Sequence, residues 1–359
     1  MADSFWRDRK VFISGVCGTV GRELLTQVLA SGVSEVTGLD NNESELFFLE
    51  EEYRGDVRAR FSLGDVRDRD TLTARIRGCD VVLHAAALKH VSLCEASPGD
   101  AIETNIRGVQ NIIEASLAGA VARVLFTSSD KAVNPTNVMG TSKLMGERLM
   151  TAANASRRGE TPVFVSTRFG NVLGSRGSVI PLFLRQIAAG GPLTLTDPEM
   201  TRFIMTLSEA VKLVMDSASL ARGGEAFVTK MPVVRIEDLA RVMVEECAPR
   251  YGYRAEDIEV RVIGSKPGEK LYEELMNVEE VRRAVELDRY FVVRPAFQSL
   301  HHDIDYTYPH TISDRVSNPY NSAVEPALSK EALRVYLRES GLLDVPRAPA
   351  GTTEPTGGA

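Results

Sequence analysis

A short apolar stretch at residues 10–14 is followed at once by three regularly spaced glycines, Gly15, Gly18 and Gly21. A helical pattern then continues to about Ala30. Glycine permits a tight turn between strand and helix, and it lets a diphosphate approach the backbone at the helix N-terminus. The motif therefore predicts the first strand, turn and helix of a parallel α/β sheet that binds a dinucleotide.

Three further features favour the same kind of site. Asp40 follows a second strand at 35–39, where a carboxylate accepts hydrogen bonds from both hydroxyls of an adenosine ribose. Asp65 follows a third short strand and fits a contact to the adenine amino group. A fourth strand at 81–84 runs into small residues, Ala85–Ala87, against which a cofactor can lie. Each feature alone also suits an ordinary α/β turn, but together they favour a cofactor.

The expected cofactor is NAD and not NADP, because a carboxylate at Asp40 would repel the phosphate that NADP carries on that ribose. Asp is also a favoured helix N-cap, and a purely structural role of Asp40 stays open. The residues expected to bind the cofactor in this part of the chain are Gly15, Gly18, Thr19, Val20, Gly21, Asp40, Asp65, Val66, Ala85, Ala86 and Ala87.

The composition is that of an ordinary globular protein and excludes several other classes. The chain has 359 residues, of which 43% are hydrophobic and 25% charged. Its net charge of −7, with no basic cluster, argues against nucleic acid or an anionic membrane as a partner. Four cysteines, Cys17, Cys79, Cys94 and Cys247, have neither metal nor disulfide spacing. We therefore expect a reduced, cytoplasmic protein without a metal site.

Strand and helix patterns alternate up to about Arg168, which predicts a Rossmann-type doubly wound parallel sheet in an NAD-binding domain at 1–168. Residues 169–340 are expected to form a mixed region, with a smaller C-terminal substrate-binding lobe and segments that return to the first domain. The helices expected within this lobe span 235–246 and 271–276. Pro, Gly, Ala and Thr dominate 345–359, which is expected to be disordered.

Two helices, expected at about 101–118 and 142–155, have apolar stripes on more than one face. This pattern suits packing against the sheet and also pairing across a two-fold axis. We expect a homodimer or a higher homo-oligomer, although core packing alone would explain the stripes equally well.

The chemistry is indicated by Ser129-Asp130-Lys131, followed by Met139 and Lys143. A short-chain dehydrogenase has Ser or Thr after its fifth strand and then Tyr-x-x-x-Lys, whereas this chain has Met139 at the Tyr position. The thioether of Met139 cannot transfer a proton at neutral pH. The chain instead has an Asp-Lys pair, Asp130-Lys131, beside the hydroxyl of Ser129. The exchange predicts a nicotinamide enzyme that does acid–base work beyond alcohol oxidation. The alternative is a salt-bridged turn on the surface.

The chain resembles the extended short-chain dehydrogenase/reductase superfamily over about residues 8–340. Within it, the chain is similar to nucleotide-sugar 4,6-dehydratases that act on N-acetylglucosamine diphosphates, including the sialic-acid-type branch. The resemblance is carried by segments 84–91, 129–137, 168–172, 197–203, 266–271 and 318–322.

The resemblance implies a redox-neutral conversion of UDP- or GDP-N-acetylglucosamine to the 4-keto-6-deoxy sugar, with retention at C5, for surface glycan or nonulosonic acid biosynthesis. It implies that Asp130 is the acid at C6 and Lys131 the base at C5. Ser129 would hold or deprotonate the C4 hydroxyl, and Lys143 would bind the nicotinamide ribose. A close Asp–Lys pair opposes the pKa shifts that burial produces, so the placement of the proton within the pair stays open.

The remaining candidates are substrate contacts. Cationic side chains suit a diphosphate, an amide suits a phosphate oxygen, and a carboxylate suits a nucleoside ribose. The alternative for each residue is an ordinary hydrogen bond within a loop. The candidates are Lys89, Asn171, Arg202, Lys266 and Glu269. Two other functions stay open: a nucleotide-sugar epimerase on the same scaffold, and a non-catalytic NAD-binding sensor or scaffold.

Overall fold

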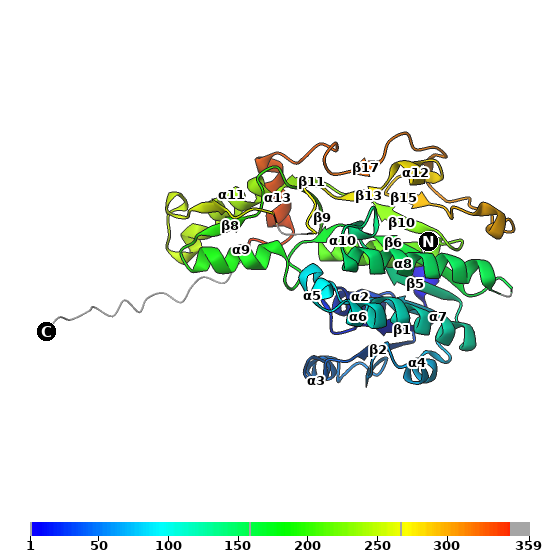
Figure 1. Ribbon diagram of the computed structural model, residues 1–359. Coiled ribbons are helices and arrows are strands. Elements are labelled where there is room, and N and C mark those ends of the chain that lie inside the picture. Colours follow the sequence, from blue (N-terminus) through cyan, green and yellow to red (C-terminus); the bar gives the residue numbers. More distant parts are fainter. Residues whose placement is uncertain (1, 158, 266–267, 345–359) are drawn as a thin grey trace.

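The computed structural model of the protein describes residues 2–157, 159–265 and 268–344. One large sheet with helices on both faces forms the body of the molecule, and a smaller lobe lies beside it (Figure 1). The expected fold class, a Rossmann-type doubly wound sheet with a smaller C-terminal lobe, is confirmed. Lys266 and the segment 345–359, for which a phosphate contact and disorder were expected, lie outside the described residues.

The body of the sheet is parallel and has the strand order expected for dinucleotide binding. In spatial order its strands are β3 (Ala59–Leu63), β2 (Glu35–Asp40), β1 (Lys10–Ser14), β4 (Val81–His84), β5 (Arg123–Thr127), β6 (Val163–Arg168) and β10 (Ala226–Thr229). Antiparallel strands extend the sheet beyond β10; they are β15 (Tyr290–Val293), β14 (Ala284–Leu287) and β16 (Thr311–Ser313). The order reverses between β1 and β4, and ligands of such sheets bind at this switch point.

Helices cover both faces of the sheet. On one face lie α1 (Ala2–Trp6), α2 (Thr19–Ala30), α3 (Glu43–Glu52) and α10 (Leu207–Leu220). On the other face lie α4 (Arg69–Ile76), α7 (Gly108–Ala118) and α8 (Val138–Ser156). Three short segments precede α7: α5 (Val91–Ala96), α6 (Pro98–Ala101) and the π-helical turn η1 (Ile102–Arg107). The expected helix at 101–118 is therefore present, but its first turns are π-helical.

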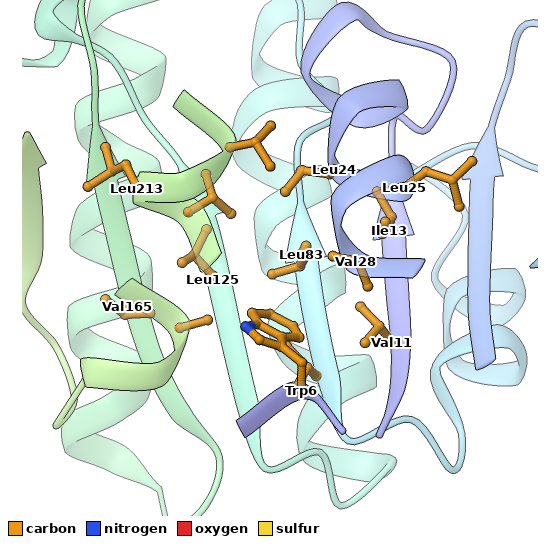
Figure 2. Packing of buried hydrophobic residues seen from close by; sticks show 14 of the residues in the cluster. Trp6, Val11, Ile13, Leu24, Leu25, Val28, Leu83, Leu125, Val165 and Leu213 are labelled. Carbon is orange, nitrogen blue, oxygen red and sulfur yellow. The ribbon is translucent and has the colours of Figure 1, made fainter. Parts of the chain in front are cut away.

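The alternation of side chains along β1 shows how the sequence produces this layering. Val11 and Ile13 are fully buried against α2, whereas Phe12 is fully buried in the core on the opposite face. Successive side chains of a strand point to opposite faces, so a strand that is covered on both sides is apolar at every position. Figure 2 shows the first of these cores, in which Trp6 of α1 packs beside Leu83 and Leu125.

The lobe is assembled from separate parts of the chain around its own core. Its helices are α9 (Val179–Ala188), α11 (Ile236–Cys247) and α13 (Lys330–Glu339), and its paired strands are β8 (Leu193–Leu195) and β12 (Val260–Val262). Two small sheets join lobe and body. They consist of β7 (Asn171–Val172), β9 (Thr201–Met205) and β11 (Val233–Arg235), and of β13 (Glu274–Met276) and β17 (Tyr320–Asn321). The helical turn α12 (Val278–Val281) follows β13.

The expected helix at 235–246 is present as α11, but the expected helix at 271–276 is wrong. Residues 274–276 form strand β13, which pairs with β17. Leu275 and Met276 are fully buried there, in a core that also contains Tyr320. Leu, Glu and Met are good helix formers, but helix propensity is a weak determinant, and pairing with a distant strand overrides it here.

Candidate functional site

In the glycine motif between β1 and α2, neither Gly15 nor Gly21 has room for a side chain. Gly15 has a φ of +73°, and a Cβ on it would lie 2.7 Å from the backbone of Ala86. A Cβ on Gly21 would lie 2.0 Å from the carbonyl oxygen of Gly15. Thr19 and Val20 form the first turn of α2, and Gly18 at its N-cap offers no side chain to cap it. The loop thus presents a bare helix N-terminus, as a diphosphate requires.

A cavity of about 280 Å³ opens beside this loop at the switch point. Its wall contains Gly15, Gly18, Asp40, Asp65, Val66 and Ala85–Ala87, which come from the carboxyl ends of four strands. The Oδ2 atom of Asp40 accepts a hydrogen bond from the backbone of Cys17 at 2.9 Å. The adjoining helix α3 is capped by Asn42, and not by Asp40. The residues present therefore fit the adenosine half of a dinucleotide.

Asp65 has two partners within the protein that the sequence did not indicate. Its carboxylate pairs with the Arg67 guanidinium, with 2.8 Å between Oδ2 and Nη2, and accepts a hydrogen bond from the Asn41 amide at 3.1 Å. The Arg67 hydrogen bond lowers the pKa of Asp65 to about 2. Asp65 lines the cavity as an anion, which suits an amino group as its partner.

A strap at residues 173–178 crosses from the lobe to this cavity. Arg176 lines the cavity, and its Nη2 lies 3.0 Å from Oε2 of Glu45 on α3. The backbone nitrogen of Arg176 donates to Thr19 Oγ1 at 3.3 Å, and its carbonyl accepts from Lys89 Nζ at 2.6 Å. Lys89, an expected sugar contact, is therefore bonded to the strap in this structure.

The Ser129-Asp130-Lys131 segment begins a short 3₁₀ turn, η2 (Asp130–Ala132), directly after β5. Ser129 Oγ donates to Asp130 Oδ1 at 2.6 Å, and Lys131 Nζ lies 3.2 Å from the same Oδ1. Asp130 is 1% exposed, which excludes the surface salt bridge considered above. Burial lowers the pKa of Lys131, but the carboxylates of Asp130 and Glu273 outweigh it, so the pKa is raised overall.

Met139 and Lys143 lie one turn apart on α8 and play different parts. Met139 is buried with Cys94 and Ala101 in a small apolar cluster. The Nζ atom of Lys143 donates to the carbonyl of Thr127 at 2.9 Å and lies 4.7 Å from the ring centre of Phe126. Burial lowers the pKa of Lys143 to about 8.

A second cavity, of about 330 Å³, has Lys131 of the turn at 129–131 in its wall. It brings together Lys131, Asn171, Arg202 and Glu269, which are far apart in the sequence. Oδ1 of Asn171 is buried and has no hydrogen-bond partner among the described residues. Arg202 lines the cavity, but its guanidinium also donates to carbonyls of the loop before β13, with 2.8 Å from Nη2 to the Lys270 oxygen.

The structure adds two residues to the candidate site that the sequence analysis did not single out. The first is Glu273, which lines the second cavity. Its Oε1 atom lies 3.2 Å from Lys131 Nζ. The second is Asn105 in the π-helical turn, whose side chain holds both backbone polar groups of Leu88 and bonds to Ser142. π-helical turns often occur at functional sites, but their sequence signature is weak.

A buried ion-pair network lies next to the turn at 129–131. The guanidinium of Arg168 lies 2.6 Å from Oε2 of Glu147 and 2.7 Å from Oε1 of Glu280. Glu147 also accepts a hydrogen bond at 2.6 Å from Oγ of Ser128, the residue just before this turn. All three charged residues are at most 5% exposed. The network therefore ties β6, α8 and α12 together.

The sequence matches a family model and several known proteins. A sequence model of the family described as "Polysaccharide biosynthesis protein" matches residues 11–295. A Methanocaldococcus jannaschii protein named uncharacterized membrane protein MJ1061 is 46% identical, over 95% of this chain and 98% of its own. A UDP-glucose 4-epimerase of Rickettsia akari is 40% identical, over 79% of this chain and 82% of its own.

Among solved structures, Pen from Bacillus thuringiensis superposes with a TM-score of 0.86 at 41% identity, covering 93% of this chain and 98% of that one. A dTDP-glucose 4,6-dehydratase of Streptomyces venezuelae, solved with NAD bound, shares the fold at 23% identity and a TM-score of 0.64 over 73% of this chain and 86% of that one. In the part of the chain that the structure describes, we find no helix with the length and apolar character needed to cross a membrane.

Proposed function

The chain belongs to the polysaccharide biosynthesis family of extended short-chain dehydrogenases/reductases, and on that premise we propose that it is an NAD-dependent nucleotide-sugar 4,6-dehydratase. Its substrate would be a UDP- or GDP-linked N-acetylglucosamine, and its product the 4-keto-6-deoxy sugar for a surface glycan or a nonulosonic acid. The observation that carries the proposal is the Ser129-Asp130-Lys131 turn, in which Asp130 is buried and Lys131 lines the second cavity.

NAD held beside Gly15, Asp40 and Asp65 would supply the hydride chemistry of this proposal, as the acceptor of hydride from C4 and the donor of hydride to C6. Ser129 accepts the proton of the C4 hydroxyl while its own proton passes to Asp130 Oδ1, 2.6 Å away. Lys131 takes the C5 proton, and the electron pair of the C5–H bond forms the C5–C6 double bond. The C6 hydroxyl leaves with the proton of Asp130 as water. The proton on Lys131 then returns to C5, so the protons balance.

The other expected residues have supporting roles. Lys143 would lie against the nicotinamide ribose, where a positive charge favours hydride loss from the sugar. Lys89, Asn171, Arg202 and Glu269 would face the nucleotide and the sugar, and Lys266 would add charge at the diphosphate. The exposed Leu117 on α7 and Met145 on α8 suit pairing with a second copy, so a homodimer is part of the proposal.

The 40% identity to a UDP-glucose 4-epimerase supports a second candidate, an epimerase on the same scaffold. Mass spectrometry separates the two after incubation with UDP- and GDP-N-acetylglucosamine. Dehydration removes the mass of one water from the substrate, whereas epimerisation leaves the mass unchanged. Epimerised sugar with unchanged mass would overturn the dehydratase proposal. An absence of turnover with either sugar would favour a sensor or scaffold.

The product is expected to retain its configuration at C5. Met139 cannot donate a proton, and Lys131 returns its proton to the face from which it took it. Proton NMR of product formed in deuterated water reports the configuration at C5. An inverted centre would show that another group protonates the opposite face.

NAD is expected to remain bound through purification, because a redox-neutral cycle never requires its release. Asp40 should exclude NADP by repelling its ribose phosphate. Denaturing the purified protein and identifying the released nucleotide by chromatography tests both points. A preparation that contains mainly NADP would contradict this role of Asp40.

A further inference from the structure

Glu273 stands just before β13, at the wall of the second cavity, and is 2% exposed. Its backbone is held on both sides by Ser322. The Glu273 nitrogen donates to Ser322 Oγ at 2.9 Å, and the Ser322 nitrogen donates to the Glu273 carbonyl at 2.9 Å. The backbone of Glu273 is therefore held at the end of the pairing between β13 and β17.

The carboxylate of Glu273 and that of Asp130 flank the Lys131 ammonium. Lys131 Nζ lies 3.2 Å from Glu273 Oε1 and 3.2 Å from Asp130 Oδ1. Arg202, from β9, has its Nε 3.7 Å from the same Oε1 and completes the charged groups that face Lys131 and Glu273. Two anions and two cations thus meet at one edge of the cavity.

The second oxygen of Glu273 points to a role beyond an ion pair. Oε2 is buried and has no hydrogen-bond partner among the described residues. Burying half of a carboxylate without a partner costs stability, and Lys131 already has Asp130 as a counter-ion. A merely structural residue at this position would be better satisfied or apolar.

We propose that Glu273 is a positioning residue that holds Lys131 toward C5 of the sugar and stabilises the ammonium that forms when Lys131 takes the C5 proton. The inference rests on the proposed dehydratase function. The arrangement follows the logic of other acid–base sites, in which a buried carboxylate orients the base and stabilises its protonated form. Asp130 cannot hold this role through the whole step, because it has to carry and give up the proton for the leaving hydroxyl.

The electrostatics agree with this role. Burial lowers the pKa of Lys131 and Arg202 opposes its charge, but Asp130 and Glu273 together raise the pKa above its ordinary value. Burial and the charge of Asp130 raise the pKa of Glu273 in turn. Removing the carboxylate of Glu273 removes one of the two groups that favour protonated Lys131, so the pKa of Lys131 must fall.

The test is Glu273→Gln, which keeps the shape of the side chain and removes its charge. In the wild type, kcat should rise with pH as Lys131 loses its proton. In Glu273→Gln the rising limb of the kcat–pH curve is expected to move toward lower pH by roughly one unit, because the pKa of Lys131 falls. The plateau value of kcat is also expected to fall, because Lys131 is then a weaker base. Glu273→Asp should return the limb toward the wild-type position. A structural defect would lower kcat without moving the limb.

Glu274→Gln is the matched control, since Glu274 is the next residue in the chain and pairs with Lys270, 3.8 Å away, and not with Lys131. Its rising limb should stay at the wild-type pH. A limb that does not move in Glu273→Gln, or that moves equally in Glu274→Gln, would overturn the inference.

A second measurement does not depend on turnover. Competitive acetylation with acetic anhydride, read by peptide mass spectrometry across a pH series, gives the pKa of Lys131 directly. We expect a lower pKa in Glu273→Gln than in the wild type, and an unchanged pKa overturns the inference. If the wild type dehydrates the sugar but the pKa of Lys131 is the same in Glu273→Gln, only the role of Glu273 is refuted. If the wild type never releases water from the sugar, the proposed function itself is refuted.

Discussion

Lys131→Met is expected to abolish the elimination of water while NAD stays bound. Methionine has a similar length but no lone pair that can take the C5 proton, and loss of a general base costs on the order of 10⁴-fold at the upper end. Lys131 lines the second cavity and not the cavity beside the glycine loop, so cofactor retention should be unaffected. The first half of the cycle should survive, and reduced nicotinamide should accumulate when substrate is added.

The measurement combines product mass, near-ultraviolet absorbance of the reduced cofactor and nucleotide content. Lys230→Met is a matched control, because Lys230 is equally half-buried and pairs with Glu286 away from both cavities. Asp130→Asn should slow turnover by about 10²- to 10⁴-fold through loss of the general acid. Near-normal turnover in either Lys131→Met or Asp130→Asn would show that the roles are assigned wrongly.

Arg168→Met is expected to lower the free energy of unfolding by about 3–5 kcal/mol, the usual cost of breaking a buried ion pair on one side. The reason is that Glu147 and Glu280 would remain buried, facing an apolar side chain. Burial raises the pKa of Glu280, but Arg168 outweighs it and keeps the pKa low, so the carboxylate depends on this cation. Urea denaturation at neutral pH measures the loss.

Two further variants separate charge from packing. Adding Glu147→Gln and Glu280→Gln to Arg168→Met should recover part of the stability, because neutral amides are cheaper to bury than unpaired carboxylates. Arg254→Met removes an exposed arginine paired with Asp257 and should change little. A small loss in Arg168→Met, equal to that in Arg254→Met, would mean that the buried network does not hold the body and α12 together.

The parts that sequence predicted well depend on neighbours in the chain. The glycine loop, the second strand before Asp40 and the turn at 129–131 are all short segments whose geometry follows from local residue types. Asn171 and Arg202 were expected at the substrate, and the structure brings both to the second cavity. Their roles there stay predictions.

The parts that sequence missed depend on distant partners. Glu280 pairs with Arg168, which is 112 positions away in the sequence. The local sequence around neither residue predicts this ion pair. Glu273 was overlooked for the same reason. The segment 271–276 was assigned to a helix, so the strand that places Glu273 opposite Lys131 was not recognised. A helical period would have pointed this carboxylate elsewhere.

The discontinuous lobe has a consequence for how the protein is made. Strand β13 pairs with β17 at 320–321, and Leu333 and Leu337 of α13 are fully buried in the lobe core. Domains tend to fold as units during synthesis, N-terminal parts first. The parallel strands of the body, the last of which is β10, can therefore form on the ribosome before the lobe core is complete. The nascent chain would expose its unfilled lobe core until α13 emerges, which is the interval in which a chaperone would be most useful.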